Sequence, residues 1–333
     1  MLFVGVDAHK ESSHVTVMDE RGQVLPRKSI SSTREGVHSV LDGHSEPFKA
    51  VVEASYGWGP MYDWLDEMAQ EVVLAHPLKV RAIAEARIKT DKIDSEILAH
   101  LLRADLVPAA YAPDRSVRAI KPVLRQRLFL VRVRTMVKNR AQALLARHAL
   151  ARPQVSDLYG KEGMRWLKSI ELPVPDGKLL EEDLSLIAML EERIATTEGL
   201  IEELCRGDEA VRWLRSLPGI GKFLSVLIRY EIDEIGRFRT AKKLAAYTGL
   251  VPSTYASGAR LVHGRLTKEG NKWLRWTFIE AASSAIRVSH PLRRHYEAVK
   301  QRHGTKASRA ATARKLVELT WTLWTERRCY EKR

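Results

Sequence analysis

The chain has 333 residues, of which 45% are hydrophobic, so it is long enough for two or three domains with substantial cores. Lys and Arg exceed Asp and Glu by 14, which favours a polyanionic partner. No apolar run approaches the ~18 residues of a membrane-spanning helix, and no signal peptide precedes the first predicted strand. The cysteines, Cys205 and Cys329, are too few for a disulfide framework and indicate a reducing cytoplasm.

Residues 1–108 have the pattern of a mixed α/β domain. Three antiparallel strands are followed by alternating helices and strands, which is the order of an RNase-H-like sheet. In such a sheet the catalytic carboxylates stand on the first strand, the fourth strand and a later helix. The predicted elements are strands at 2–7, 14–18 and 23–31, a helix at 36–41, a strand at 48–53, a helix at 60–69 and a strand at 71–75.

Four acidic residues in this part have the separations of a nuclease-type metal site. Asp7 ends the first predicted strand and Glu53 ends the fourth. Asp91 and Asp94 lie three apart at the start of a helical pattern, so they share one face of the helix. Four carboxylates brought together repel one another unless a divalent cation neutralises them. We therefore predict that these residues hold Mg²⁺.

Residues 109–206 form a predicted helical region. Between 115 and 156 there are eleven Lys or Arg and no Asp or Glu, whereas the second helical pattern is acidic. Each pattern has an apolar heptad seam, which predicts a helical hairpin or an intermolecular coiled coil. The basic helix is either a solvated spacer or a surface for nucleic-acid backbone, and we favour the backbone contact. Its contact residues would be Arg132, Arg134, Lys138 and Arg140. The seams are Val123, Leu130, Val133, Val137 and Leu144, and Ile187, Leu190, Ile194, Ile201 and Leu204.

Residues 207–333 form a third, mainly helical unit. The turn Leu217-Pro218-Gly219-Ile220-Gly221 separates two helical patterns and predicts a helix-hairpin-helix motif. Such a turn directs backbone N–H groups at a phosphate, and Lys222 directly after it favours this function. An ordinary helix–helix connection is the alternative.

A polar loop follows, in which Ser257 stands directly before Gly258. From residue 257 to 315, fourteen basic residues face three acidic ones, and Arg260, Arg265 and Lys268 lie closest to the serine. A serine in such surroundings is a candidate nucleophile towards a phosphodiester. A Ser-Gly pair in a polar loop is also what a simple turn requires.

Several of these segments together resemble a known family. They resemble, in order, the insertion-sequence transposases of the "IS one-ten" type, the bridge-RNA-guided DNA recombinases. The resemblance covers nearly the whole chain and implies a RuvC-like DEDD domain (1–108), a coiled-coil region (109–206) and a transposase domain with a serine nucleophile (207–333). The matching segments are Gly5–Lys10, Thr90–Ser95, Leu217–Gly221 and Tyr247–Arg275.

The resemblance also implies roles for individual residues. Asp7, Glu53, Asp91 and Asp94 take the metal-binding acidic places, and Ser257 takes the place of the nucleophile. Relatives often have a second serine before it and a second glycine after Ser-Gly, where this chain has Ala256 and Ala259. The first departure removes a competing nucleophile, although Ser253 remains one, and the second leaves the loop geometry less defined.

The implied mechanism joins both sites. The carboxylates would hold Mg²⁺ on the scissile phosphate while Ser257 attacks, and the protein–DNA ester would conserve the bond energy for rejoining. The resemblance further implies protomers that share active sites in a tetramer, donor and target DNA as substrates, a structured guide RNA, and a bacterial cytoplasm near the nucleoid.

Two other functions are compatible with the residues. One is a metal-dependent, RuvC-like resolvase or nuclease that hydrolyses branched DNA, with Ser257 as a turn residue. The other is a non-catalytic nucleic-acid-binding protein whose acids serve as structural ion-pair partners. A covalent protein–DNA product distinguishes the recombinase from the first. Retained cleavage after Asp7→Asn would count against a catalytic role of the acids and so favour the structural role that the second function gives them.

Overall fold

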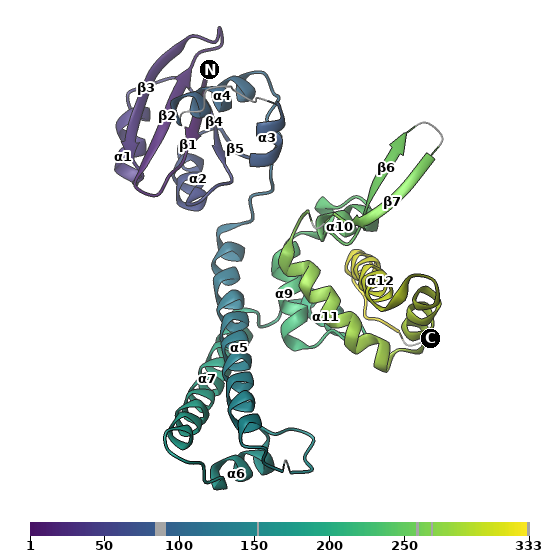
Figure 1. The fold of residues 1–333 in the computed structure, drawn as a ribbon. Helices are drawn as coiled ribbons and strands as arrows, with labels where there is room; N and C mark the ends of the chain where they lie inside the picture. Colours follow the sequence, from purple (N-terminus) through teal and green to yellow (C-terminus); the bar gives the residue numbers. More distant parts are fainter. Residues whose placement is uncertain (84–90, 152, 258–259, 268, 332–333) are drawn as a thin grey trace. The chain divides into compact units, whose positions relative to one another are not determined.

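The computed structural model describes residues 1–83, 91–151, 153–257, 260–267 and 269–331; the side chains at 91–92, 254–257 and 260–263 also lie outside this description. Within it the chain divides into two compact units, 1–112 and 113–333 (Figure 1). The division into three domains at 108 and 206 stays a prediction. None of the helices in these ranges is long and apolar enough to cross a membrane.

A five-stranded mixed sheet forms the centre of the first unit. Its strand order is β3-β2-β1-β4-β5. Strand β1 pairs in parallel with β4 and β4 with β5, whereas β1–β2 and β2–β3 are antiparallel. The mixed α/β architecture predicted for this part is confirmed. The strands are β1 (Leu2–Asp7), β2 (Ser12–Met18), β3 (Val24–Ser31), β4 (Phe48–Glu53) and β5 (Glu71–Ala75).

Helices cover both faces of this sheet. On one face Val4 and Val52 pack with Val40 of α1 and Leu65 of α2 in one apolar cluster. On the other face a smaller cluster joins strand residues such as Val51 to Leu98 and Leu102 of α4. The helices are α1 (Arg34–Leu41), α2 (Trp58–Asp66), α3 (Pro77–Ile83) and α4 (Asp91–Arg103).

The second unit begins with a helical hairpin. Helices α5 (Arg115–Arg147) and α7 (Asp176–Leu204) lie side by side, and α6 (Lys161–Ser169) lies near the closed end (Figure 1). Leucines and valines of α5 share a buried cluster with Ile187 and Ile194 of α7, so the predicted seams meet within one chain. Leu204 is the exception, because its side chain is 46% exposed at the end of α7.

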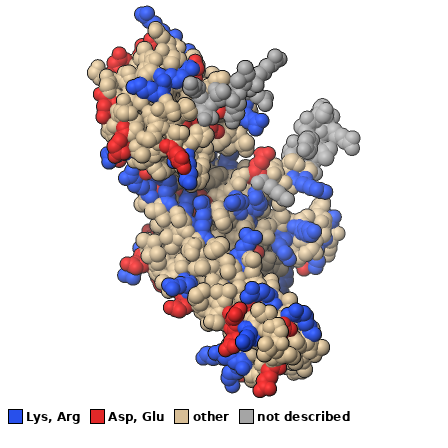
Figure 2. Space-filling model, turned by 60° about the vertical axis from the view of Figure 1, so that its left-hand side comes forward, with Lys and Arg blue, Asp and Glu red and all other residues tan. Residues whose placement is uncertain are grey.

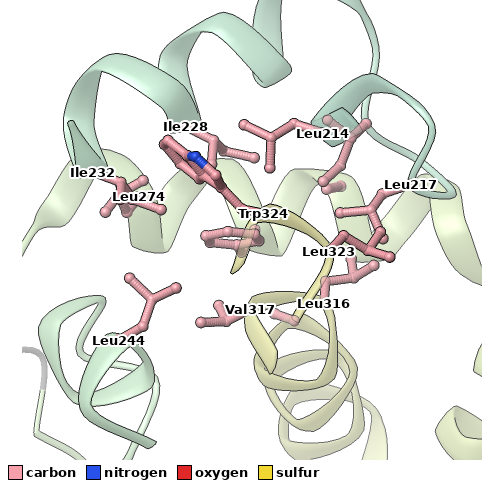
Figure 3. Packing of buried hydrophobic residues seen from close by; sticks show 14 of the residues in the cluster. Leu214, Leu217, Ile228, Ile232, Leu244, Leu274, Leu316, Val317, Leu323 and Trp324 are labelled. Carbon is pink, nitrogen blue, oxygen red and sulfur yellow. The ribbon is translucent and has the colours of Figure 1, made fainter. Parts of the chain in front are cut away.

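The remainder of the second unit is mainly helical, as predicted. Its core contains Leu214, Ile228, Leu274, Leu316 and Trp324, which come from four helices and lie close together in Figure 3. A further cluster joins the start of α5 and the end of α7 to α9. The elements are α8 (Glu209–Arg215), α9 (Lys222–Ile232), the 3-10 helix η1 (Ile235–Arg237), α10 (Ala241–Tyr247), β6 (Pro252–Ser257), β7 (Arg260–Leu266), α11 (Lys272–Val288) and α12 (His290–Thr325).

Candidate functional sites

Asp7 and Glu53 end neighbouring parallel strands on the same face of the sheet. The register pairs Val6 of β1 with Val52 of β4, so the next residue of each strand is one of these acids. Successive side chains alternate between the faces of a strand. Val6 and Val52 belong to the α1/α2 cluster, and Asp7 and Glu53 therefore belong to the face that α4 covers.

Helix α4 carries the other two predicted acids and crosses β1 at very short range. A Cβ placed on Gly5 would lie 2.1 Å from the Ser95 carbonyl oxygen and 2.6 Å from the Ala99 amide nitrogen. Only glycine lets the helix backbone approach this closely. The Ser95 hydroxyl is hydrogen-bonded to Thr16 at 2.9 Å, and both side chains are fully buried. This contact places Asp94, the residue before Ser95, on the helix turn that packs against β1.

The side chain of Asp7 is removed from solvent. The residue is 5% exposed, and its Oδ2 accepts a hydrogen bond from His9 Nε2 at 3.2 Å. Ser55 donates to the Ala8 carbonyl at 3.3 Å, which ties the loop after β4 to the loop after β1. His9 therefore has a carboxylate partner at the end of β1.

The acidic residues fit a hard divalent cation by their chemistry, since all four donate carboxylate oxygens. The described residues do not show the complete geometry of such a site. In the part of the chain that the structure describes, no group of three His, Cys, Asp or Glu is arranged to hold a metal ion. Asp91 opens α4, but its side chain lies outside the described residues. The four-ligand Mg²⁺ site stays a prediction supported by the shared face and the packing of α4.

Ser257 ends β6, whose partner in a two-stranded antiparallel ribbon is β7. It pairs with Arg260, the first residue of β7. Gly258 and Lys268 lie outside the described residues, as do the side chains of Ser257 and Arg260. Arg265 is exposed on the same ribbon. The predicted loop is thus a β-hairpin, and the role of Ser257 as nucleophile stays a prediction.

The base of this ribbon is held together by backbone contacts. The amide of Thr267 donates to the Val251 carbonyl at 3.1 Å, and the amide of Asn271 donates to the Tyr247 carbonyl at 2.8 Å. A Cβ on Gly270 would lie 2.3 Å from that same Tyr247 oxygen. The chain therefore enters the ribbon from the end of α10 and leaves it at the start of α11 through one closely packed junction.

A buried carboxylate, Glu231 of α9, supports this junction. Glu231 is 2% exposed; its Oε2 accepts from Asn271 Nδ2 at 2.8 Å and its Oε1 from Arg125 at 3.4 Å. The Asn271 Oδ1 also accepts from the amides of Trp273 and Leu274, which caps α11. A buried charge is stable only with such partners. The network could not be predicted from the sequence, because its members are far apart in the chain and no local motif joins them.

The same network perturbs a lysine of α5. Burial lowers the pKa of Lys121 below its ordinary value, and the nearby Glu231 charge opposes that shift. Arg125, one helical turn further along α5, also lies over the ring of Trp273 at 5.4 Å. Helix α5 is therefore linked to the start of α11 by Arg125, which contacts both the Trp273 ring and the buried Glu231 of α9.

Packing requires the first glycine of the turn between α8 and α9. Gly219 has φ 78°, and a Cβ there would lie 2.3 Å from the Ala281 carbonyl of α11. Gly221 caps α9 and has open space around it. The Lys222 ammonium contacts Glu202 of α7 at 2.6 Å. Packing on α11 explains Gly219 without a phosphate, and phosphate binding at Gly219, Gly221 and Lys222 stays a prediction.

Several cations of α5 have acidic partners elsewhere in the chain. Helix α7 supplies them: Arg134 and Lys138 both contact Glu191, at 3.8 and 3.3 Å, and Arg140 contacts the buried Asp183. In the view of Figure 2, acidic and basic side chains are mixed at the lower end of the molecule, where Figure 1 places α6. Arg132 is exposed and has no ion pair with the described residues. These acidic partners lie on a different helix of the hairpin, far from the cations along the chain.

Comparisons with known proteins agree on one family. Residues 4–149 match a family model described as "Transposase", and residues 211–297 match the model "Transposase IS116/IS110/IS902 family". The chain is 26% identical to a probable family 20 transposase of Pseudomonas aeruginosa, over 98% of each chain. It is 25% identical to the transposase for insertion sequence element IS1328 of Yersinia enterocolitica, over 99% of this chain and 98% of that one. With the transposase for insertion sequence element IS1111A of Coxiella burnetii it shares 23% identity over 98% of this chain and 90% of the other.

Proposed function

The chain belongs to the IS116/IS110/IS902 family of transposases, and we propose that it is the RNA-guided DNA recombinase of an insertion sequence. The family implies an enzyme that cleaves and rejoins DNA and therefore binds it. The observation that carries the proposal is the placement of Asp7 and Glu53 on one sheet face under α4. The strand order β3-β2-β1-β4-β5 supports an RNase-H-like, RuvC-like assignment for this unit.

In this proposal the acidic face binds the scissile phosphate through a divalent cation. Asp7, Glu53, Asp91 and Asp94 would hold it, and Mg²⁺ bound there would offset the negative charge that develops on the phosphate. Burial of Asp7 under α4 excludes water from one side of its carboxylate. The hydrogen bond from His9 fixes the orientation of that carboxylate.

Ser257 would supply the nucleophile from the β6–β7 ribbon. Its hydroxyl oxygen forms an ester with the phosphorus, the bond from phosphorus to one strand end breaks, and that end leaves as a hydroxyl. The serine proton passes to solvent or to a nearby base. Attack by a different hydroxyl end reverses the step and restores the serine, so rejoining needs no ATP. Arg260 and Arg265 would stabilise the charge of the pentavalent transition state.

Three features of the proposal rest on the family resemblance and on charge. They are sequence recognition by a structured guide RNA, donor and target DNA bound together, and dimers that assemble into a tetramer. The net charge of +14 supports binding of a polyanionic partner such as DNA or RNA. Arg132, exposed and without an ion pair among the described residues, is the member of the α5 set best placed for backbone contact.

A hydrolytic resolvase is the second candidate, and one observation favours it. The acidic face is contained within the unit formed by residues 1–112 and needs no residue of the ribbon to bind a phosphate. In that case metal-activated water would cleave branched DNA and both ends would be released. Ser257 would then only close the β6–β7 turn.

The state of the DNA ends decides between the two. Denaturing gels of a strand-exchange reaction should show a protein–DNA adduct with the parent chain and none with Ser257→Ala, while both proteins bind DNA equally. Ser253→Ala is the matched control and should retain the adduct. Loss of the adduct in Ser253→Ala alone would move the nucleophile to Ser253. Free phosphate ends without any adduct would establish the resolvase.

A further inference from the structure

We propose that the bend of α12, residues 298–309, is a binding surface for the sugar-phosphate backbone of duplex DNA; this surface is called the α12 elbow below. The inference rests on the proposed function only in taking DNA as the substrate. It does not depend on the acidic face or on Ser257.

The elbow is a solvent-exposed interruption of α12. Helix α12 is interrupted at Gly304, whose φ of 77° and ψ of 176° are not helical, and a Cβ there would meet nothing within 4 Å. Tyr296 before the bend is 8% exposed and Ser308 after it is fully buried. Between these two residues only Val299 is even partly buried. The bend is therefore anchored at both ends and open to solvent between them.

Most of the Lys and Arg side chains of the elbow are exposed and lack acidic partners. From Ala298 to Val317 the chain contains no Asp or Glu. Arg302, Lys306 and Arg309 are exposed, lie on both sides of Gly304 and form no ion pair with the residues described. Lys300 contacts Glu297 at 3.4 Å and lies over the Tyr296 ring at 5.6 Å, and His303 is a fifth basic residue of the elbow. Unpaired, exposed cations are what a phosphate backbone selects.

Two other basic segments of the second unit differ in this respect. On α5, Arg127, Lys138 and Arg147 contact acids of α7. On the last turns of α12, Arg314 and Lys315 both contact Glu318 at 3.5 Å. Pairing removes much of their attraction for a second anion. The elbow therefore differs from these two segments, because Arg302, Lys306 and Arg309 are exposed and form no ion pair with the described residues.

The elbow also lies beyond residues 211–297, the range that matches the second family model. Its cations contact backbone, not base edges, because three flexible side chains spread over a bend offer no paired hydrogen-bond pattern. Duplex DNA is the partner we assign, since it is the substrate that the family requires.

The test removes the three unpaired charges and measures binding to a short duplex DNA over a salt series. Arg302→Gln, Lys306→Gln and Arg309→Gln together keep good helix formers on α12. They should flatten the slope of log binding constant against log salt by up to about 2.7, at ~0.9 for each lost contact. Arg302→Lys, Lys306→Arg and Arg309→Lys together keep every charge and should bind DNA as the parent chain does.

The matched control loses the same charge elsewhere. Lys161, Arg165 and Lys168 are exposed on α6, and their replacement by Gln should leave the slope nearly unchanged. An unchanged slope in the elbow variant, or an equal change in the α6 variant, would overturn the proposal. So would a loss of structured RNA binding without loss of DNA binding, or a changed oligomeric state with normal DNA binding. This experiment measures DNA binding, whereas the Ser257→Ala experiment measures strand transfer. A negative result in one therefore does not imply a negative result in the other.

Discussion

Asn271 Nδ2 donates a hydrogen bond to the Glu231 carboxylate over 2.8 Å, while Asn271 Oδ1 caps the first turn of α11. One side chain thereby joins a buried charge of α9 to the helix that begins where the β6–β7 ribbon ends. Arg125 brings α5 to the same carboxylate at 3.4 Å. The position of the ribbon depends on this junction.

Asn271→Ala should therefore destabilise the second unit. The change removes an N-cap, worth ~1 kcal/mol, and a hydrogen bond to a buried charge, worth ~1.5–3 kcal/mol. We expect the free energy of unfolding in urea to fall by about 2–4 kcal/mol. Asn271→Ser keeps a capping oxygen but loses the bond to Glu231. Its free energy of unfolding should lie between those of Asn271→Ala and the parent chain. Equal stability of Asn271→Ala and the parent chain would show that water replaces the asparagine at Glu231.

Gly5→Ala should push α4 away from β1. Its Cβ would lie 2.1 Å from the Ser95 carbonyl oxygen, and neither backbone can move without disturbing the other. Overpacking of this kind costs ~1–3 kcal/mol, and we also expect strand exchange to be lost because Asp94 shifts with the helix. Gly43→Ala is the control, since nothing lies within 4 Å of its Cβ. Full activity of Gly5→Ala would show that catalysis does not depend on the position of α4.

Asp7→Asn should abolish activity without harming the fold. Loss of one carboxylate weakens the hold on Mg²⁺, and even outer partners of metal ligands are worth ~10–100-fold. Strand exchange should fall by more than ~100-fold at any Mg²⁺ concentration. The unfolding temperature should stay equal or rise, because one of several neighbouring negative charges is removed. Asp42→Asn, an exposed partner of His38, is the control. Normal exchange by Asp7→Asn would refute the acidic site.

Arg132 and Lys138 should behave differently although both lie on the basic helix. Arg132→Gln removes an exposed cation without an ion pair among the described residues, and should flatten the salt slope of nucleic-acid binding by up to ~0.9. Lys138→Gln removes a cation that contacts Glu191 and lies over the Tyr159 ring, and should leave the slope unchanged. Identical slopes for Arg132→Gln and the parent chain would make α5 a purely structural helix.

Lys121 should make stability depend on alkaline pH. Burial lowers its pKa in the folded chain below the 10.5 of the unfolded chain, so the folded state loses this proton first as the pH rises. Between the two pKa values the unfolded state binds more protons, and stability therefore increases with pH in that window. Lys121→Met removes this contribution. Urea unfolding from pH 7 upward, compared for both proteins, measures it; a constant difference between them would show an unshifted lysine.

Local patterns were enough to predict much of the first unit. Alternation in Leu2–Asp7 and Phe48–Glu53 predicted both strands with their observed ends, and the acids at those ends followed directly. The period of a strand is short, so a few residues determine which side chains share a face. The heptad seams of α5 and α7 could also be predicted, because apolar residues that repeat every seven positions form the face with which a helix packs against a partner helix.

Only the tertiary structure decided which charges are paired and which side chains meet. The acids of α7 neutralise cations of α5 that looked unopposed in the segment itself, and Gly219 packs on α11. Glu231 and Asn271 are forty residues apart and no motif connects them. Coulomb energy and desolvation depend on distance in space and on burial, not on separation along the chain. For that reason the sequence could nominate charged residues for function, and the fold determined which of them remain free to bind.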